Sequence, residues 1–296
     1  MMEIMSTRQA GRAGNRRDAR RAGSHGQRLA AGSFRPVRDL FISVPLWLIA
    51  ALLFAFFVLA TVLARAVVTR RCSAESREEL ADEATRLLTG LAATFAFFVG
   101  FAITVTWGAV AAGQAAVEQQ SAAVQNMNWS INNIPDRAEG ALLREKLLLY
   151  ATAAAYKNID DLARGDTSQL PSAIPLDRFE DALHTYAFGP KVPKAEVASL
   201  VTAAAKLTTT SAEVSAIAHR TLPDLLAILL VVTGLLVAAI MGVSTVTARH
   251  PVLMLVWCII PALSITVVIA LAFPFAGGIG VDLAPLQSVA RQLAVH

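Results

Sequence analysis

The sequence predicts an all-α integral membrane protein, a helical bundle with four transmembrane helices and a helical soluble region between spans two and three. Of its 296 residues, 55% are hydrophobic and only 16% are charged, whereas about a quarter of the residues in soluble domains are charged. Four apolar runs are each long enough to cross a bilayer, which takes about 20 apolar residues. No stretch alternates between apolar and polar residues as a half-buried strand would.

Residues 1–39 are expected to form a disordered tail rich in arginine. The first 38 residues hold nine arginines but only two acidic residues, Glu3 and Asp18, and they show no apolar period. The tail is interpreted either as a solvated segment that helps to set topology or as a contact for anionic lipid head groups. Nucleic acid is not an expected partner, because Phe34 is the only aromatic side chain in the tail that could stack on bases.

The apolar runs define the membrane segments. The first run is broken only by Arg65 near its end, and a polar connection at 69–86 separates it from the second. At 1.5 Å per residue, each run can span a hydrocarbon core of about 30 Å. The spans are expected at residues 40–68, 87–112, 225–247 and 251–275, so that residues 40–112 hold the first pair and residues 223–275 the second.

Residues 113–222 are the only sizeable water-soluble part of the chain, and their pattern is helical. The second span should continue as one helix beyond the membrane until Pro135 breaks it. Apolar residues at helical spacing predict further helices, and stretches rich in Gly and Pro mark the loops between them. These helices are expected at about 137–162, 177–188 and 194–220, and residues 276–296 are expected as a C-terminal tail.

The distribution of arginine residues along the chain predicts the orientation in the membrane. Short cytoplasmic segments carry an excess of Lys and Arg near the span ends. The two sides are nearly equal by that count, so the full Arg-rich tail decides in favour of a cytoplasmic N-terminus. Four spans then return the soluble region and the C-terminus to the cytoplasmic side of the cell membrane.

Catalytic chemistry has no visible basis in the sequence. Motifs for catalysis, phosphate binding and metal coordination are missing, so we expect neither an enzyme nor a cofactor. Cys72 and Cys258 are expected to be two unpaired thiols. No span carries a charged residue at its centre, which argues against a proton-driven transporter. A channel lined by apolar rings stays compatible with the spans, because such a constriction can gate by dewetting.

The most specific pattern lies in the second span, where FAFFVGFAITVTW runs from Phe95 to Trp107. Phe97 and Phe101 form a ladder of two rings, one helical turn apart. About 60 to 100 degrees away, small residues form a row that lets membrane helices approach closely. This helix-packing seam consists of Ala96, Gly100, Thr104 and Gly108. The ladder faces either the axis of an oligomer or another helix, and the pattern alone leaves both arrangements open.

Several short motifs resemble a known family. Phe97-Phe98-Val99-Gly100-Phe101, followed by Trp107, resembles the second span of bestrophins. The closer resemblance is to the bestrophin-like family of bacterial four-span membrane proteins, and it covers roughly residues 40–292. Its further motifs appear as Arg70-Arg71, an Ala-rich run after Trp107, Pro274-Phe275-Ala276-Gly277, Val281 and Pro285-Leu286.

The resemblance implies a bestrophin-type helical fold and a homo-oligomeric, ring-shaped channel for small anions, with span two lining the axis. The constriction would lie at Ala93, Phe97 and Phe101, where Ala93 is smaller than the residue expected. Ala272-Phe273 replaces an Asp-Arg pair of the bacterial family, and acidic clusters for calcium control have no counterpart. The alternative is a non-conducting membrane scaffold or sensor whose soluble helices bind a partner protein.

Overall fold

The computed structural model describes residues 44–189, 194–219, 222–248, 252–276 and 280–295. The expected Arg-rich tail lies outside these residues. The chain divides into two units, Met1–Pro45 and Leu46–His296, and the second unit contains every helix named below. Its described residues form nine α-helices and one π-helical turn without a strand, which confirms the all-α fold class.

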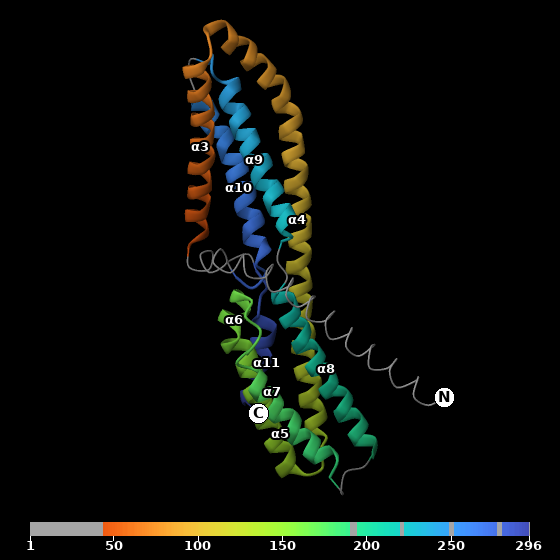
Figure 1. Ribbon diagram of the computed structural model, residues 1–296. Helices are drawn as coiled ribbons and strands as arrows, with labels where there is room; N and C mark the ends of the chain where they lie inside the picture. Colours follow the sequence, from red (N-terminus) through yellow and green to blue (C-terminus); the bar gives the residue numbers. More distant parts are fainter. Residues whose placement is uncertain (1–43, 190–193, 220–221, 249–251, 277–279, 296) are drawn as a thin grey trace, which may run out of the picture. The chain divides into compact units, whose positions relative to one another are not determined.

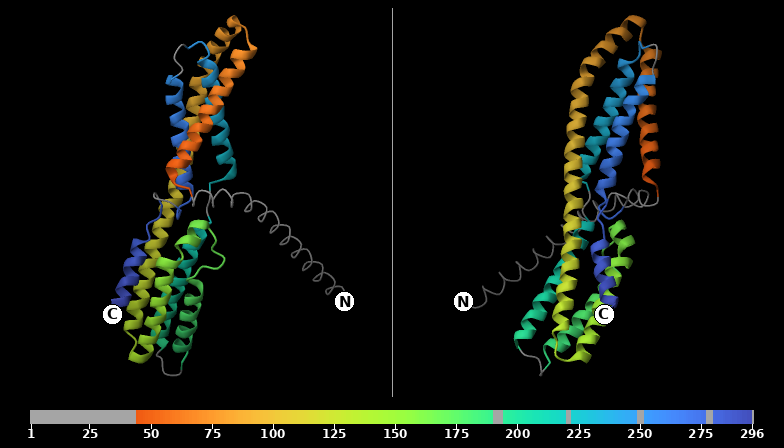
Figure 2. Two further views of the ribbon diagram at one scale, coloured as in Figure 1. Left: turned by 90° about the vertical axis from the view of Figure 1, so that its left-hand side faces the viewer. Right: turned by 180° about the vertical axis from the view of Figure 1, so that it is seen from behind.

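Four of these helices are long and apolar enough to cross a membrane. They are α3 (Leu46–Arg71), α4 (Ala74–Asn132), α9 (Asp224–Ser244) and α10 (Val252–Ala272), and they run side by side in Figures 1 and 2. The four spans predicted from the apolar runs are therefore confirmed. The ends of α3 and α9 meet through Arg65, whose guanidinium donates to the carbonyl oxygens of Thr245 at 2.8 Å and Ala248 at 3.3 Å.

The packing of α9 against α3 depends on small residues. A Cβ added at Gly242 would lie 2.3 Å from the Thr61 carbonyl oxygen, and one added at Gly234 would lie 3.2 Å from the Phe57 ring. Ala238, between the two glycines, is buried. The row Gly234, Ala238, Gly242 is thus a small-xxx-small row along which two helix backbones approach closely.

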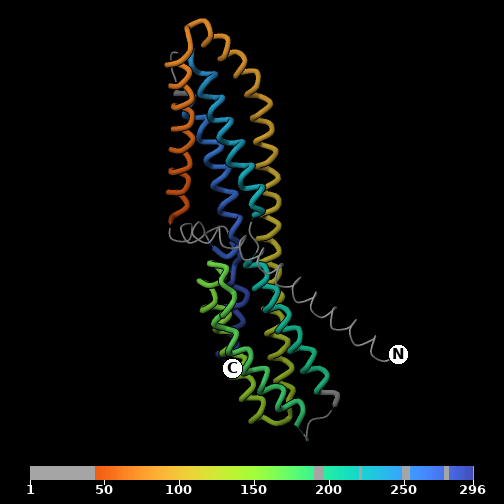
Figure 3. The backbone as a smooth tube through the Cα atoms, viewed as in Figure 1, coloured from red at the N-terminus to blue at the C-terminus, as the bar shows by residue number. Residues whose placement is uncertain are grey.

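Helix α4 connects the membrane-spanning part to the soluble part. Its N-cap is Ser73, whose hydroxyl accepts a hydrogen bond from the Ser76 amide, and it continues for 59 residues to Asn132. At 1.5 Å per residue it is about 90 Å long, and Figure 3 shows it running through both parts without a break. The continuous helix predicted up to Pro135 is present. The domain boundary expected at 112/113 lies inside this helix.

The soluble helices pack around the second half of α4. They are α5 (Arg137–Thr152), the π turn η1 (Ala153–Lys157), α6 (Ile159–Arg164), α7 (Ala173–Ala187) and α8 (Lys194–Ala218). The single helix expected at 137–162 is therefore divided by the π turn. Inside this core, the Gln120 side-chain amide donates to the Tyr150 hydroxyl at 2.7 Å. Burial raises the pKa of Tyr150 above its usual value.

The C-terminal residues differ from the expectation. Instead of a tail at 276–296, residues Ala284–Val295 form helix α11, which buries Leu286, Val289 and Leu293 in the soluble core. Their spacing of three and four places them on one helical face. The hydroxyl of Ser121 on α4 donates to the Pro285 carbonyl oxygen at 3.1 Å and ties α11 to α4.

Candidate functional site

The predicted constriction residues lie together on the surface of α4. Phe97 and Phe101 are 69% and 52% exposed, and Ala93, one turn before them, is also exposed. The Phe97 ring forms a T-shaped contact with Phe98, with the ring centroids 5.8 Å apart. Two large apolar rings thus point out of the chain at membrane depth.

The predicted packing seam is exposed as well. A Cβ added at Gly100 or Gly108 would meet no atom within 4 Å, and Ala96 and Thr104 are exposed beside them. The Thr104 hydroxyl donates to the Gly100 carbonyl oxygen at 2.8 Å, so its polarity is satisfied within the helix. Within the part of the chain that the structure describes, the seam therefore packs against no other helix, and packing against another chain stays a prediction.

A different face of α4 holds the bundle together. Phe95, Val99 and Ala102 are buried against Phe57 and residues of α9 and α10, and Thr106 is buried one turn further on. Buried and exposed residues thus share the stretch from Phe95 to Trp107. The span has one face that stabilises the fold and one face without a partner.

The face without a partner continues far beyond the membrane span. Exposed residues recur on α4 at alternating steps of four and three. This spacing of 3.5 residues keeps one side of a long helix turned toward a left-handed supercoiling neighbour. We call these residues the exposed stripe: Phe97, Phe101, Thr104, Gly108, Ala111, Ala115, Glu118, Ala122, Gln125 and Trp129.

The chemistry of the exposed stripe changes along its length. Its first six residues are aromatic or small, and its last four include Glu118, Gln125 and Trp129. Glu118 is the only charged residue of the sequence between Arg86 and Asp136. Its carboxylate accepts from the Gln114 amide at 3.2 Å, and the Gln114 carbonyl oxygen accepts from the Asp282 backbone amide at 2.9 Å.

The end of the fourth span packs against α4 just above Glu118. A Cβ added at the buried Gly113 would lie 2.6 Å from a Val281 methyl group and 3.8 Å from the Phe275 ring. Gly113 therefore allows the segment after α10 to approach α4 closely. Phe275 and Val281, two positions of the motifs that suggested the family, thus act at this junction. Gly277 of the same motifs lies outside the described residues.

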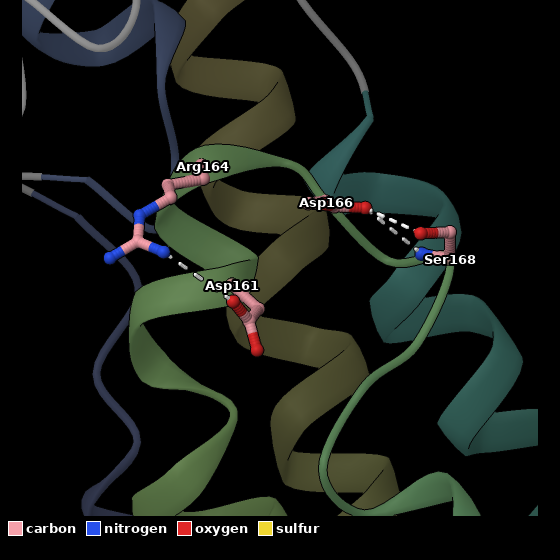
Figure 4. Close-up of polar contacts among 4 residues, drawn as sticks. All are labelled: Asp161, Arg164, Asp166 and Ser168. Carbon is pink, nitrogen blue, oxygen red and sulfur yellow. Dashed lines mark hydrogen bonds and ion pairs between the residues drawn. The ribbon is translucent and has the colours of Figure 1, made fainter.

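The acidic residues of the soluble part form ordinary surface contacts. In Figure 4, an Arg164 guanidinium nitrogen lies 3.8 Å from an Asp161 carboxylate oxygen, and Asp166 accepts from the Ser168 hydroxyl at 2.6 Å. Within the described ranges, no group of three or more His, Cys, Asp or Glu side chains could hold a metal ion. Cys72 and Cys258 are free thiols.

A groove lies between α4 and α8 in the soluble part. Its volume is about 540 Å³, and its polar lining includes Asn126, Thr202 and Lys206. Its two lining residues on α4, Ala123 and Asn126, stand on either side of Gln125 of the exposed stripe in the sequence. No sequence motif pointed to this groove, because it depends on how two helices far apart in sequence come together.

Sequence reasoning located the rings and the seam but missed the length of the exposed stripe and the place of Glu118. A signal was present, since the steps of four and three from Phe97 to Trp129 can be counted in the sequence. This pattern identifies an exposed face only when the buried face of α4 is known. The sequence does not show which face is buried, because small residues of α4 occur on both faces.

Comparison with known proteins identifies a family and several solved structures that share this architecture. The model of the Bestrophin-like domain matches residues 53–286. Similar solved structures include a bacterial bestrophin homolog from Klebsiella pneumoniae with 12% identity and a TM-score of 0.60, covering 83% of this chain and 97% of that chain. A variant of that homolog has 14% identity and a TM-score of 0.62, with 81% and 97% covered.

A third similar crystal structure is that of a variant protein described as a membrane protein. It has 13% sequence identity to this chain and a TM-score of 0.64, and the match covers 83% of this chain and 97% of that chain. At such identities, these likenesses show a common fold. No curated protein matches the chain. The resemblance stated from the motifs is confirmed by the domain match, which covers most of the chain, and the protein belongs to the Bestrophin-like family of membrane proteins.

Proposed function

We propose that the protein is a homo-oligomeric channel for small anions in the cell membrane, with the exposed stripe of α4 lining its axis. Phe97 and Phe101 form the constriction, and Ala93 leaves a wider opening next to them. The observation that carries this proposal is the exposure of both rings, 69% and 52%, on the same face of one uninterrupted helix.

Copies of the same chain are the partners that fit this face. In a ring of helices, each helix has one side turned to the axis and another turned to its neighbour. Gly100 of the seam lies about 60 to 100 degrees from the rings on an α-helix, which suits the neighbour-facing side, whereas Gly108 lies within about 20 degrees of the rings and belongs to the exposed stripe. Since no described atom lies within 4 Å of a Cβ added at Gly100, a second backbone can approach there closely.

The ion class follows from the lining and from the family. Aromatic rings carry partial positive charge at their edges, so rings that turn their edges to an axis favour anions over cations. The exposed stripe carries no charge from Phe97 to Ala115, so an ion crosses this part without a fixed counter-ion. Bestrophins, which the second span resembles, are expected to pass small anions. A narrow apolar neck can also close by dewetting.

The proposed orientation places the Arg-rich tail, the soluble helices and α11 in the cytoplasm. The lipid bilayer is the partner of the apolar outer faces, where Trp47 and Leu225 are among the most exposed side chains. The basic tail then contacts anionic lipids of the inner leaflet.

Anion flux tests the proposal. Liposomes loaded with chloride and reconstituted with the purified protein should release it faster than empty vesicles. The double variant Phe97→Ala, Phe101→Ala should release it faster still, because removing the rings widens the neck and lowers the dewetting barrier. The control Phe56→Ala removes a ring that is 43% exposed on α3 and should leave the flux unchanged. Equal release from empty, wild-type and double-variant vesicles contradicts the proposal.

The groove between α4 and α8 favours a second candidate, a non-conducting scaffold or sensor whose soluble helices bind a partner protein. In that case the purified protein is a monomer without an axis, and the flux experiment gives no signal above empty vesicles. Chemical cross-linking of the purified protein therefore separates the two candidates before any flux is measured.

A further inference from the structure

The exposed stripe carries a single ionisable side chain, and it lies on the soluble side of the two rings. Glu118 is 21 residues from Phe97 and 17 from Phe101. At 3.5 residues per turn, 21 residues are six whole turns, so Glu118 returns to the face of Phe97. The separation along the helix is about 30 Å at 1.5 Å per residue. An ion that has passed the rings would next meet this carboxylate.

The Glu118 carboxylate is held in place by a hydrogen bond from a neutral side chain. Gln114 donates to it at 3.2 Å, and Gln114 is itself fixed by the Asp282 backbone amide at 2.9 Å. Among the residues that the structure describes, no Lys, Arg or His forms an ion pair with Glu118. The chain Asp282–Gln114–Glu118 therefore orients the carboxylate through neutral groups, and no cation among the described residues is paired with it.

We propose that Glu118 is a specificity-determining residue of the pore, which limits the preference for anions that the aromatic neck provides. The inference rests on the proposed function, since it requires the exposed stripe to line an axis. Each subunit then contributes one carboxylate to a ring on the soluble side of the neck. Rings of Asp or Glu favour cations in a conduction path, so this ring raises the local concentration of cations and lowers that of anions.

The size of the effect can be bounded from Coulomb's law. In a water-like dielectric, one carboxylate about 7 Å from the ion path changes the local concentration of a monovalent ion about two- to threefold. The change has opposite sign for anions and cations, so the ratio of the two permeabilities responds to both. Screening reduces the effect, because the Debye length falls from about 30 Å at 0.01 M salt to about 3 Å at 1 M.

The test is the reversal potential of the reconstituted full-length protein under a gradient of potassium chloride. Glu118→Gln keeps the size of the side chain and a carbonyl that can accept from Gln114, but removes the charge. It should raise the chloride-to-potassium permeability ratio at least about threefold at low salt, and by much less at 1 M. Glu118→Lys should raise the ratio further, and Glu118→Asp should leave it close to that of the wild type.

The matched control is Glu145→Gln. Glu145 is exposed on α5 and is not one of the residues of the exposed stripe, so the ratio should not change. An unchanged ratio in Glu118→Gln, with flux intact, overturns the inference and leaves the proposed function standing. An equal change in Glu145→Gln also overturns it, because the effect would then come from general surface charge. Wild-type vesicles that conduct no ion contradict the proposed function itself, and the inference with it.

Discussion

Replacing Gly242 by alanine should destabilise the membrane bundle. The new Cβ would lie 2.3 Å from the Thr61 carbonyl oxygen and 3.1 Å from the Ala64 Cβ. The Thr61 atom belongs to the backbone of α3, so it cannot rotate away. An ordinary contact needs about 3.4 Å, and α9 must therefore move away from α3 by about 1 Å, which is the difference between the two distances. Forced overpacking of this kind typically costs about 1–3 kcal/mol.

Helix propensity acts in the opposite direction, since alanine is better than glycine in a helix by about 1 kcal/mol. The control Gly90→Ala isolates that gain, because a Cβ at Gly90 meets no atom within 4 Å. Thermal unfolding in detergent should give a lower midpoint for Gly242→Ala than for Gly90→Ala, by about 2–12 °C at about 2–4 °C per kcal/mol. Gly90→Ala should match or exceed the wild type. If Gly242→Ala melts at or above Gly90→Ala, the close approach of α9 to α3 is wrong.

Three further predictions concern the seam, the soluble core and the orientation. Gly100→Leu should leave the helical content unchanged, because no described atom lies within 4 Å of a Cβ at this position, but it should reduce the oligomer mass measured by light scattering. An unchanged mass would contradict the seam. Because burial raises the pKa of Tyr150, the wild type should lose stability as the pH rises above about 10, where the unfolded tyrosine ionises. Thermal melts from pH 9 to 11 should show a smaller loss of stability for Tyr150→Phe than for the wild type. At pH 7 this variant should be less stable than the wild type, because the Gln120 amide loses its hydrogen-bond acceptor. A membrane-impermeant maleimide should label the half-buried Cys72 on intact cells and leave the buried Cys258 unlabelled, whereas labelling of Cys72 only after lysis would reverse the orientation.

Hydrophobicity made the spans predictable, because a bilayer requires a long run of apolar residues whatever the rest of the chain does. The length of α4 was also predictable, because no proline interrupts the helix before Pro135. Helix α11 was missed because Leu286, Val289 and Leu293 form a pattern of only 12 residues. A helix that short gains its stability from the core it covers, which a sequence does not display.

Small residues alone did not predict which helix faces pack closely within the chain. Gly100 and Gly108 on α4 and Gly234 and Gly242 on α9 follow the same small-xxx-small pattern. Among the described residues, only the pair on α9 packs closely against another helix, because Phe95 and Val99 turn the other face of α4 to the bundle. The pattern shows that a close approach is possible, whereas the partner is set by which face the larger side chains bury.

An image of purified particles in lipid nanodiscs, at a resolution that separates helices, would show directly whether α4 lines the axis of an oligomer. We expect a closed ring of copies in which α4 is the innermost helix and Phe97 and Phe101 point to the axis. A monomeric particle would contradict it. So would a ring in which α3 or α10 lines the centre and the exposed stripe of α4 faces lipid.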